Sequence, residues 1–213
     1  MNLPIIQLDL LRHGATEQGH TLRGHIDDAL TAEGLAQMQA SIDTHSNQNW
    51  HVIVSSPLLR CAHFAAPLAQ RLACPYIEVE ALKEMYFGEW EGKTTQLIYE
   101  QSPEELANFW QCPTQYSAPQ GERLIDFQTR VLNALKKLIE LMSMRHQSHA
   151  LVVTHGGVIK LLRCLAQQRP LDELLSMQAP LGELVTLQLS TQDDQLMIQE
   201  MYQSCRFGLP YSF

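Results

Sequence analysis

The chain has 213 residues, with 15 Lys and Arg against 23 Asp and Glu, which gives a formal net charge of −8 at pH 7. This length fits one domain, because chains usually divide only beyond about 250 residues. The acidic balance disfavours nucleic acids and anionic membranes as partners, since both attract Lys- and Arg-rich surfaces. No apolar run approaches the roughly 18 residues that a membrane span needs.

The five cysteines are odd in number and include no Cys-x-x-Cys pair, which is typical of reduced thiols in a reducing compartment. The N-terminal apolar run is short and interrupted by Asp9, and no basic segment precedes it, so no signal peptide is predicted. We therefore expect a cytoplasmic protein. The sequence leaves monomer and homodimer open.

Short apolar runs alternate with helical periods along the chain, which predicts an α/β fold with helices on both faces of the sheet. Ser56 is interpreted as a helix N-cap and Pro57 as the first residue of that helix. The expected strands lie at 5–11, 51–54, 76–79 and 150–154, with an antiparallel pair at 184–189 and 196–201. The first expected helix follows Thr31 and runs through Leu35, Met38 and Ile42. The others run from Pro57 to about 72, from about 123 to 144 and from 158 to 165.

Basic side chains follow three of the predicted strands. Arg12 and His13 follow the first strand, Arg60 the second and His155 the fourth. Ligands of open α/β sheets bind beyond the carboxyl ends of the strands. After His155, two glycines open a helix whose free N–H groups suit an anion. Together these residues indicate a phosphate site. Taken singly, each histidine is also consistent with a structural hydrogen bond, and Arg60 with an exposed helical arginine.

Four sequence blocks occur in order, and they carry a family resemblance. They are Leu11-Arg12-His13-Gly14-Ala15-Thr16-Glu17 with Gly24-x-x-Asp27, then Ser55-Ser56-Pro57-Leu58-x-Arg60, then Leu82-x-Glu84-x-x-Phe87-Gly88-x-Trp90-Glu91-Gly92, and Val153-Thr154-His155-Gly156-Gly157. Over nearly the whole chain they resemble the histidine phosphatase superfamily. The resemblance implies one domain over residues 1–213, with the phosphoglycerate-mutase-like fold: three α/β/α layers around a mostly parallel sheet.

The resemblance also implies a mechanism in two phosphoryl-transfer steps. His13 would attack phosphorus and carry the phosphoryl group as a phosphohistidine. Arg12 and Arg60 would bind the phosphoryl oxygens through their guanidinium groups. His155 would donate a hydrogen bond to a third oxygen as charge develops there.

The family spacing selects Glu84 among several neighbouring glutamates. It would protonate the leaving alkoxide and then accept a proton from the hydrolytic water. Gly24 and Gly156 are implied as further substrate contacts, beside Arg12, Arg60 and Glu84. No metal or cofactor is expected, because the other histidines show no metal-ligand spacing.

Residues 86–122 have weak periodicity and are predicted to form an inserted cover over the site. They hold 7 of the 15 aromatic residues, and six glutamates against one lysine. We expect the aromatic side chains either to form the walls for a flat ligand or to pack the cover onto the sheet. The acidic balance of the cover disfavours a substrate with a second phosphate or a carboxylate.

Within the family, Pro119-x-Gly121-Glu122 before Phe127-x-x-Arg130 is most similar to the members that dephosphorylate α-ribazole 5′-phosphate in cobalamin nucleotide-loop assembly. We therefore expect a phosphomonoester hydrolase with this small-molecule substrate. The alternatives are a broad-specificity sugar or metabolite phosphatase, a phosphoglycerate-mutase-like enzyme and a catalytically silent phosphate-binding module. Two departures from the family pattern are the absence of an Asn soon after Gly14 and the presence of Arg123 where many members have Ser.

Overall fold

The computed structural model describes residues 4–45, 48–192 and 195–201. Its centre is a six-stranded sheet of order β3-β2-β4-β1-β5-β6. The first four strands of the chain pair in parallel, whereas β5 is antiparallel to both β1 and β6. The bounds are β1 Ile6–Arg12, β2 Val52–Ser55, β3 Tyr76–Glu78, β4 His149–Thr154, β5 Leu184–Gln192 and β6 Gln195–Glu200. The mostly parallel sheet and the final antiparallel pair are both confirmed.

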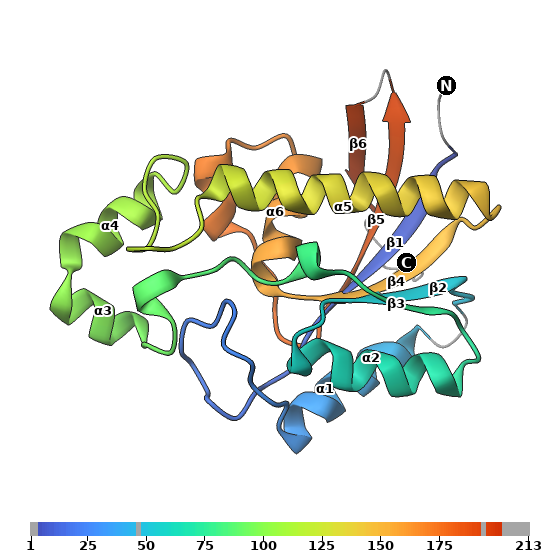
Figure 1. Ribbon diagram of the computed structural model, residues 1–213, viewed down its shortest axis with the longest axis horizontal. Coiled ribbons are helices and arrows are strands. Elements are labelled where there is room, and N and C mark those ends of the chain that lie inside the picture. Colours follow the sequence, from blue (N-terminus) through green and yellow to red (C-terminus); the bar gives the residue numbers. More distant parts are fainter. Residues whose placement is uncertain (1–3, 46–47, 193–194, 202–213) are drawn as a thin grey trace, which may run out of the picture.

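Helices cover both faces of the sheet, which confirms the three-layer architecture (Figure 1). One face carries α1 (Ala32–Thr44) and α2 (Leu59–Arg71), and the other carries α5 (Leu124–Met144) and α6 (Gly156–Ala166). Two shorter helices, α3 (Thr95–Gln101) and α4 (Pro103–Gln111), lie to one side of these layers. Three 3₁₀ turns complete the part of the chain that the structure describes: η1 (Glu80–Leu82), η2 (Gly88–Trp90) and η3 (Leu171–Ser176).

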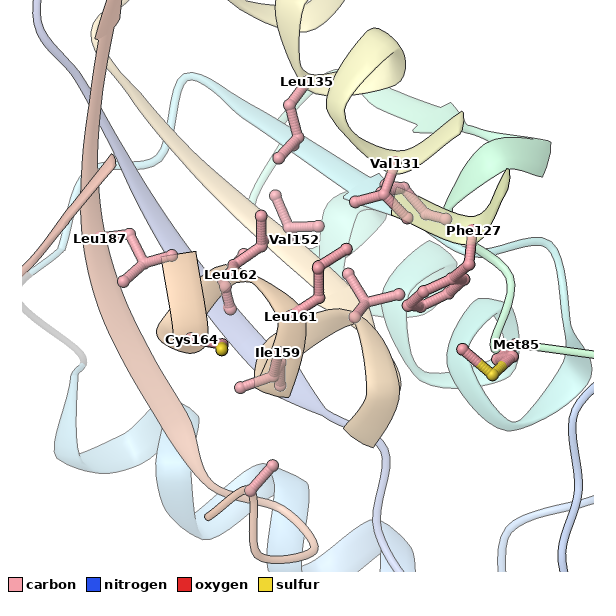
Figure 2. Close-up of a cluster of buried hydrophobic side chains, with 14 of the residues drawn as sticks. Met85, Phe127, Val131, Leu135, Val152, Ile159, Leu161, Leu162, Cys164 and Leu187 are labelled. Carbon is pink, nitrogen blue, oxygen red and sulfur yellow. The ribbon is translucent and has the colours of Figure 1, made fainter. Parts of the chain in front are cut away.

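The central strands are buried on both faces, as expected of parallel strands between helical layers. Figure 2 shows the larger cluster, in which Phe127, Val131 and Leu135 of α5 lie near α6 and the sheet. These three residues recur at every fourth position and therefore form one apolar face of the helix. In the described parts of the chain, no helix is both long and apolar enough to cross a bilayer.

The predicted start of the second helix is wrong by two residues. Leu58 is the N-cap of α2 and makes no side-chain capping bond, and the helix begins at Leu59. The Ser56 hydroxyl accepts the N–H of Leu58, the residue before the helix, at 3.3 Å, and it also lies 2.7 Å from Nε2 of His155. The first N–H group of the helix is bound by a residue from another loop, because the Leu59 N–H donates to Asp27 Oδ1 at 2.6 Å.

Parallel pairing of β1, β4 and β2 brings the ends of three strands to one edge. Arg12 lies opposite Thr154, and Ser55 lies opposite Val153. The backbone bonds continue one residue further, because the His13 N–H donates to the Thr154 carbonyl at 3.0 Å. The residues that follow these strands are therefore neighbours in space, although up to 142 positions separate them in sequence.

Inside the sheet, Asp9 is a buried carboxylate that joins three strands and a loop. It accepts hydrogen bonds of 2.8 Å from the Trp50 indole, from His149 Nε2 and from the Thr186 hydroxyl. Burial opposes its ionisation, but these donors together lower the pKa of Asp9. The carboxylate is thus stabilised as an anion and fixes the pairing of β1 with its neighbours.

We predict that Asp9→Asn lowers the free energy of unfolding by about 1–3 kcal/mol, because an amide cannot accept all three bonds and leaves a buried donor unpaired. Urea denaturation at neutral pH measures this change. Asp43→Asn on the exposed side of α1 is the control and should change stability far less. Equal stability of Asp9→Asn and the wild type would contradict the role assigned to this carboxylate.

Candidate active site

A cavity of about 440 Å³ opens at the edge where β1 and β4 end. Four of the predicted site residues line it: Arg12, His13, Glu84 and Gly156. Arg60, His155 and Gly24 are not part of its wall. The remaining lining comes from the loop after β1, from Met85 and the cover, and from α6 and η3. The residues are Thr21, Leu22, Arg23, Met85, Phe87, Phe109, Trp110, Gly157, Lys160, Leu174 and Leu175.

His13 is buried and holds its ring proton on a defined nitrogen. Nδ1 donates to the Gly14 carbonyl at 2.9 Å, since a carbonyl can only accept, and this leaves Nε2 as an unprotonated nitrogen. Burial, reinforced by the charge of Arg60, lowers the pKa of His13 to about 3. The side chain is therefore neutral at physiological pH, the state that a histidine nucleophile requires.

Arg60 and His155 lie fully buried behind this wall. Arg60 Nε donates to His155 Nδ1 at 3.2 Å, so the proton of His155 sits on Nε2 and is directed at the Ser56 hydroxyl. The terminal nitrogens of Arg60 donate to the carbonyls of Gly24 and Ile26 at 2.7 and 2.8 Å. In this structure the donors of both side chains are therefore engaged with protein groups.

Gly24 is held by its backbone rather than presented to the cavity. Its N–H donates to Glu91 Oε1 at 2.8 Å, and its carbonyl accepts the bond from Arg60. A Cβ at this position would lie 2.1 Å from the Met85 carbonyl oxygen, so only glycine fits. The role of Gly24 as a substrate contact stays a prediction.

Glu84 is almost completely buried at the N-terminus of α6. Its Oε1 accepts the Met85 N–H and its Oε2 accepts the Gly157 N–H, each at 2.9 Å. A Cβ on Gly157 would lie 2.1 Å from Oε1, so the glycine allows this close approach. The carboxylate is thereby fixed at the cavity wall in one orientation.

Some aromatic residues of the cover line the cavity, and others pack the cover onto the core. Phe87, Phe109 and Trp110 line the cavity, while Trp90 is buried in the core and packs edge-on against Phe109 at 5.4 Å between ring centroids. Tyr99, in contrast, is largely exposed.

The glutamates of the cover do not line the cavity. Glu91 accepts backbone N–H groups of Gly24, Ile26 and Phe87, and Glu122 pairs with Arg130. The negative charge of residues 86–122 therefore does not describe the electrostatics of the site.

Two basic residues of the cavity wall were not predicted as site residues. Arg23 forms an ion pair with Asp28 at 2.7 Å, so its positive charge is the more fully compensated of the two. Lys160 donates to the Leu175 carbonyl at 3.2 Å and has no ion-pair partner among the described residues. Its position four residues after Gly156 places both on the same side of α6. This spacing from Gly156 was the one signal in the sequence that could have identified Lys160 as a site residue.

Arg123, the second departure from the family pattern, lies away from the cavity. It is 68% exposed and forms an ion pair with Asp126 at 2.7 Å. In the described ranges, no three His, Cys, Asp or Glu side chains are grouped as a metal site would require.

We predict that the two buried histidines make the fold sensitive to mild acid. The pKa of His13 is about 3 in the fold against 6.5 unfolded, so the unfolded chain binds the extra proton and stability falls as pH drops from 6.5 towards 3. One such histidine contributes a slope of about 1.4 kcal/mol per pH unit. His13→Gln should reduce the measured slope by roughly that amount between pH 6 and pH 4.5.

Denaturation curves at several pH values give these slopes. His63→Gln, at an exposed position of α2, is the matched control and should leave the slope unchanged. A slope that His13→Gln does not reduce would contradict the neutral state assigned to His13.

Comparison with known proteins agrees with this geometry. The protein-family model described as "Histidine phosphatase superfamily (branch 1)" matches residues 8–201. The adenosylcobalamin/alpha-ribazole phosphatase of Escherichia coli (strain K12) is 29% identical over 160 residues, which cover 74% of this chain and 77% of that protein. The metal-independent phosphoserine phosphatase of Arabidopsis thaliana is 30% identical over 162 residues, covering 73% and 66%. The solved structure of Bacillus stearothermophilus YhfR is 28% identical and superposes with a TM-score of 0.79, covering 91% of this chain and 95% of that one.

Proposed function

Because the chain belongs to the histidine phosphatase superfamily, we propose that it is a phosphomonoester hydrolase that acts through a phosphohistidine on His13. The observation that carries this proposal is the Nδ1–Gly14 hydrogen bond, which leaves Nε2 of a neutral His13 free to act as a nucleophile. A single domain over residues 1–213, a cytoplasmic location and a small-molecule phosphomonoester as partner belong to the same proposal.

The reaction has two balanced steps. Nε2 of His13 forms a bond to phosphorus while the ester P–O bond breaks, and protonated Glu84 gives its proton to the departing alkoxide oxygen. A water molecule then attacks the phosphohistidine, Glu84 takes a proton from that water, and the P–N bond breaks to release inorganic phosphate. Glu84 is suited to both proton transfers because its carboxyl group is fixed at the cavity wall.

Arg12, Arg60 and His155 are the proposed donors to the phosphoryl oxygens. Arg12 lines the cavity, and its Nε is buried without a hydrogen-bond partner, so an anion beside it would satisfy a costly orphan donor. Arg60 would take part if a phosphoryl oxygen replaced one of the loop carbonyls, such as that of Gly24, as acceptor. No metal ion takes part in the proposed steps.

We predict that a brief reaction with ³²P-labelled substrate, quenched in alkali, traps an acid-labile phosphoryl group on the wild type and none on His13→Ala. Added EDTA should leave the rate unchanged. Equal labelling of His13→Ala would contradict the nucleophile, and loss of activity with EDTA would contradict a metal-free reaction. A wild type that binds phosphate but hydrolyses no ester would favour the silent phosphate-binding module.

As substrate we propose α-ribazole 5′-phosphate. Three aromatic side chains of the cavity wall, Phe87, Phe109 and Trp110, support it, because they offer apolar surfaces to a flat base. The similarity to the Escherichia coli enzyme named for this substrate supports it further.

A phosphorylated small acid is the second candidate, and Lys160 is the observation that favours it. Its half-buried ammonium lines the cavity without an ion-pair partner in the described ranges, and a carboxylate of the substrate would compensate that charge. The similarity to a phosphoserine phosphatase agrees with this candidate.

Kinetics of the wild type and Lys160→Met separate the two candidates. If α-ribazole 5′-phosphate is the substrate, we predict that its kcat/KM exceeds that of O-phosphoserine by at least about tenfold, and that Lys160→Met changes it little. If a phosphorylated acid is the substrate, O-phosphoserine should exceed O-phosphoethanolamine, which lacks only the carboxylate, by at least about tenfold. Lys160→Met should then abolish that preference, because one ion pair in a shielded cavity accounts for about this factor.

A further inference from the structure

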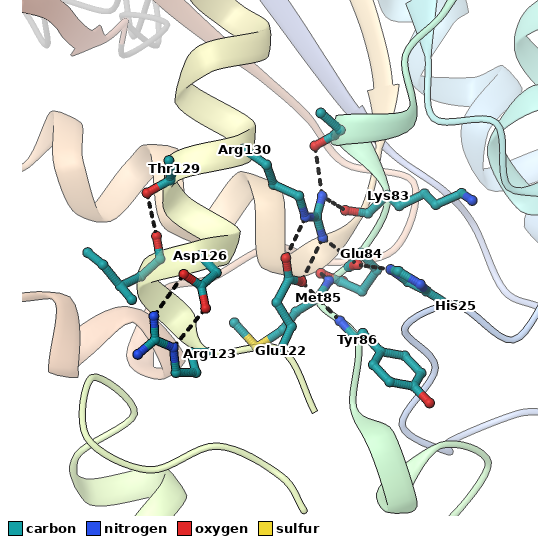
Figure 3. A network of polar contacts seen from close by, with 12 residues as sticks. His25, Lys83, Glu84, Met85, Tyr86, Glu122, Arg123, Asp126, Thr129 and Arg130 are labelled. Carbon is teal, nitrogen blue, oxygen red and sulfur yellow. Dashed lines mark hydrogen bonds and ion pairs between the residues drawn. The ribbon is translucent and has the colours of Figure 1, made fainter. Parts of the chain in front are cut away.

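Arg130 of α5 has a complete set of hydrogen bonds beside the site (Figure 3). Nε and one terminal nitrogen bind the two carboxylate oxygens of Glu122 at 2.6 and 2.8 Å. The other three N–H groups donate to the carbonyls of Ala81, Lys83 and Glu84 at 2.7, 2.9 and 2.9 Å. All five donors of the guanidinium are therefore used, and three of them hold the backbone that leads into Glu84.

The Glu84 backbone is restrained from a second direction as well. His25 Nε2 donates to the same Glu84 carbonyl at 3.1 Å. Since the carboxylate of Glu84 is also fixed by two N–H groups, both ends of this residue have defined partners. A loss of Arg130 would remove one of these two donors to the Glu84 carbonyl, together with the bonds to the carbonyls of Ala81 and Lys83, and the carboxylate bonds would have to absorb the displacement.

Glu122 connects this arrangement to the cover. The Glu122 N–H donates to the Tyr86 carbonyl at 2.8 Å, and the Tyr86 N–H donates to Glu122 Oε2 at 3.2 Å. The two ends of the 86–122 segment are thus bonded to each other, and the carboxylate that joins them also binds Arg130. Glu84 and the root of the cover form one hydrogen-bonded unit.

We propose that Arg130, oriented by Glu122, is a positioning residue that holds Glu84 where it protonates the leaving group, an inference that rests on the proposed function. Arg130 does not line the cavity, and its direct link to the proposed reacting groups is its bond to the Glu84 carbonyl. General acid catalysis depends on a placement accurate to about 1 Å. Phosphoryl binding and the attack by His13 use other residues, so we expect both to persist without Arg130.

Leaving-group dependence tests this inference. p-Nitrophenolate departs readily without a proton, whereas an alkoxide needs one. We expect Arg130→Met to reduce kcat/KM by about 10–100-fold for whichever alkyl ester, α-ribazole 5′-phosphate or O-phosphoserine, the wild type hydrolyses faster. For p-nitrophenyl phosphate the loss should stay below about fivefold, and trapping of the phosphohistidine from this ester should persist.

Two further variants and a control test whether the effect depends on the hydrogen bonds of Arg130. Arg130→Lys should not restore the alkyl ester, because an ammonium cannot reproduce the five-donor fork. Glu122→Gln should show a smaller loss with the same preference for p-nitrophenyl phosphate. The control is Arg123→Met, which removes an exposed arginine that forms an ion pair at the start of the same helix. This variant should hydrolyse both esters like the wild type.

Equal losses for both esters, or no loss for either, would overturn the inference while leaving the proposed function intact. If Arg130→Met does not fold, as judged by circular dichroism, the same comparison in Arg130→Lys and Glu122→Gln decides. Failure of the proposed function would look different, because the wild type itself would then hydrolyse neither ester and form no phosphohistidine.

Discussion

A guanidinium that is removed from water must have its N–H groups bonded, and this requirement at Arg60 organises the site. Arg60 is fully buried and spends its donors on His155 and on the carbonyls of the 23–26 loop. Those bonds select the tautomer of His155 and hold the loop against the sheet. Burial lowers the pKa of His13, and the same positive charge lowers it further. One buried cation therefore fixes a loop and a tautomer and reinforces the neutral state of a neighbouring histidine.

The parts of the site that follow strands could be predicted from sequence, because the carboxyl ends of parallel strands must meet. His13 and His155 each come directly after a β-branched or apolar run, and their rings lie 5.3 Å apart. Glu84 lies in no regular element of the sheet, so only the family spacing could select it. Its position depends on bonds to Gly157 and to Arg130, which are 73 and 46 residues away in sequence.

Two inferences from the sequence failed for physical reasons. The N-cap was assigned to Ser56, but the helix begins two residues later than predicted, and the Ser56 hydroxyl binds both the Leu58 N–H and His155. The charge of the cover was taken to describe the cavity, yet none of its glutamates lines the cavity, and Glu91 and Glu122 instead bind backbone N–H groups and Arg130. Charge counted along a segment says little about which side chains face a cavity. Lys160 illustrates the same point, because this basic residue lines the cavity although it belongs to α6 and not to the cover.

The bonds between Tyr86 and Glu122 also bear on how such a protein can diversify. Because the two ends of the cover are bonded to each other, the residues between them form a closed loop, and a change in its length does not alter the sheet. Lengthening a loop of this kind costs little, since loop-closure entropy grows only with the logarithm of loop length. The covers of related proteins could accordingly differ in size and composition above an unchanged phosphate site, and selection for new ligands would act there with little cost to folding.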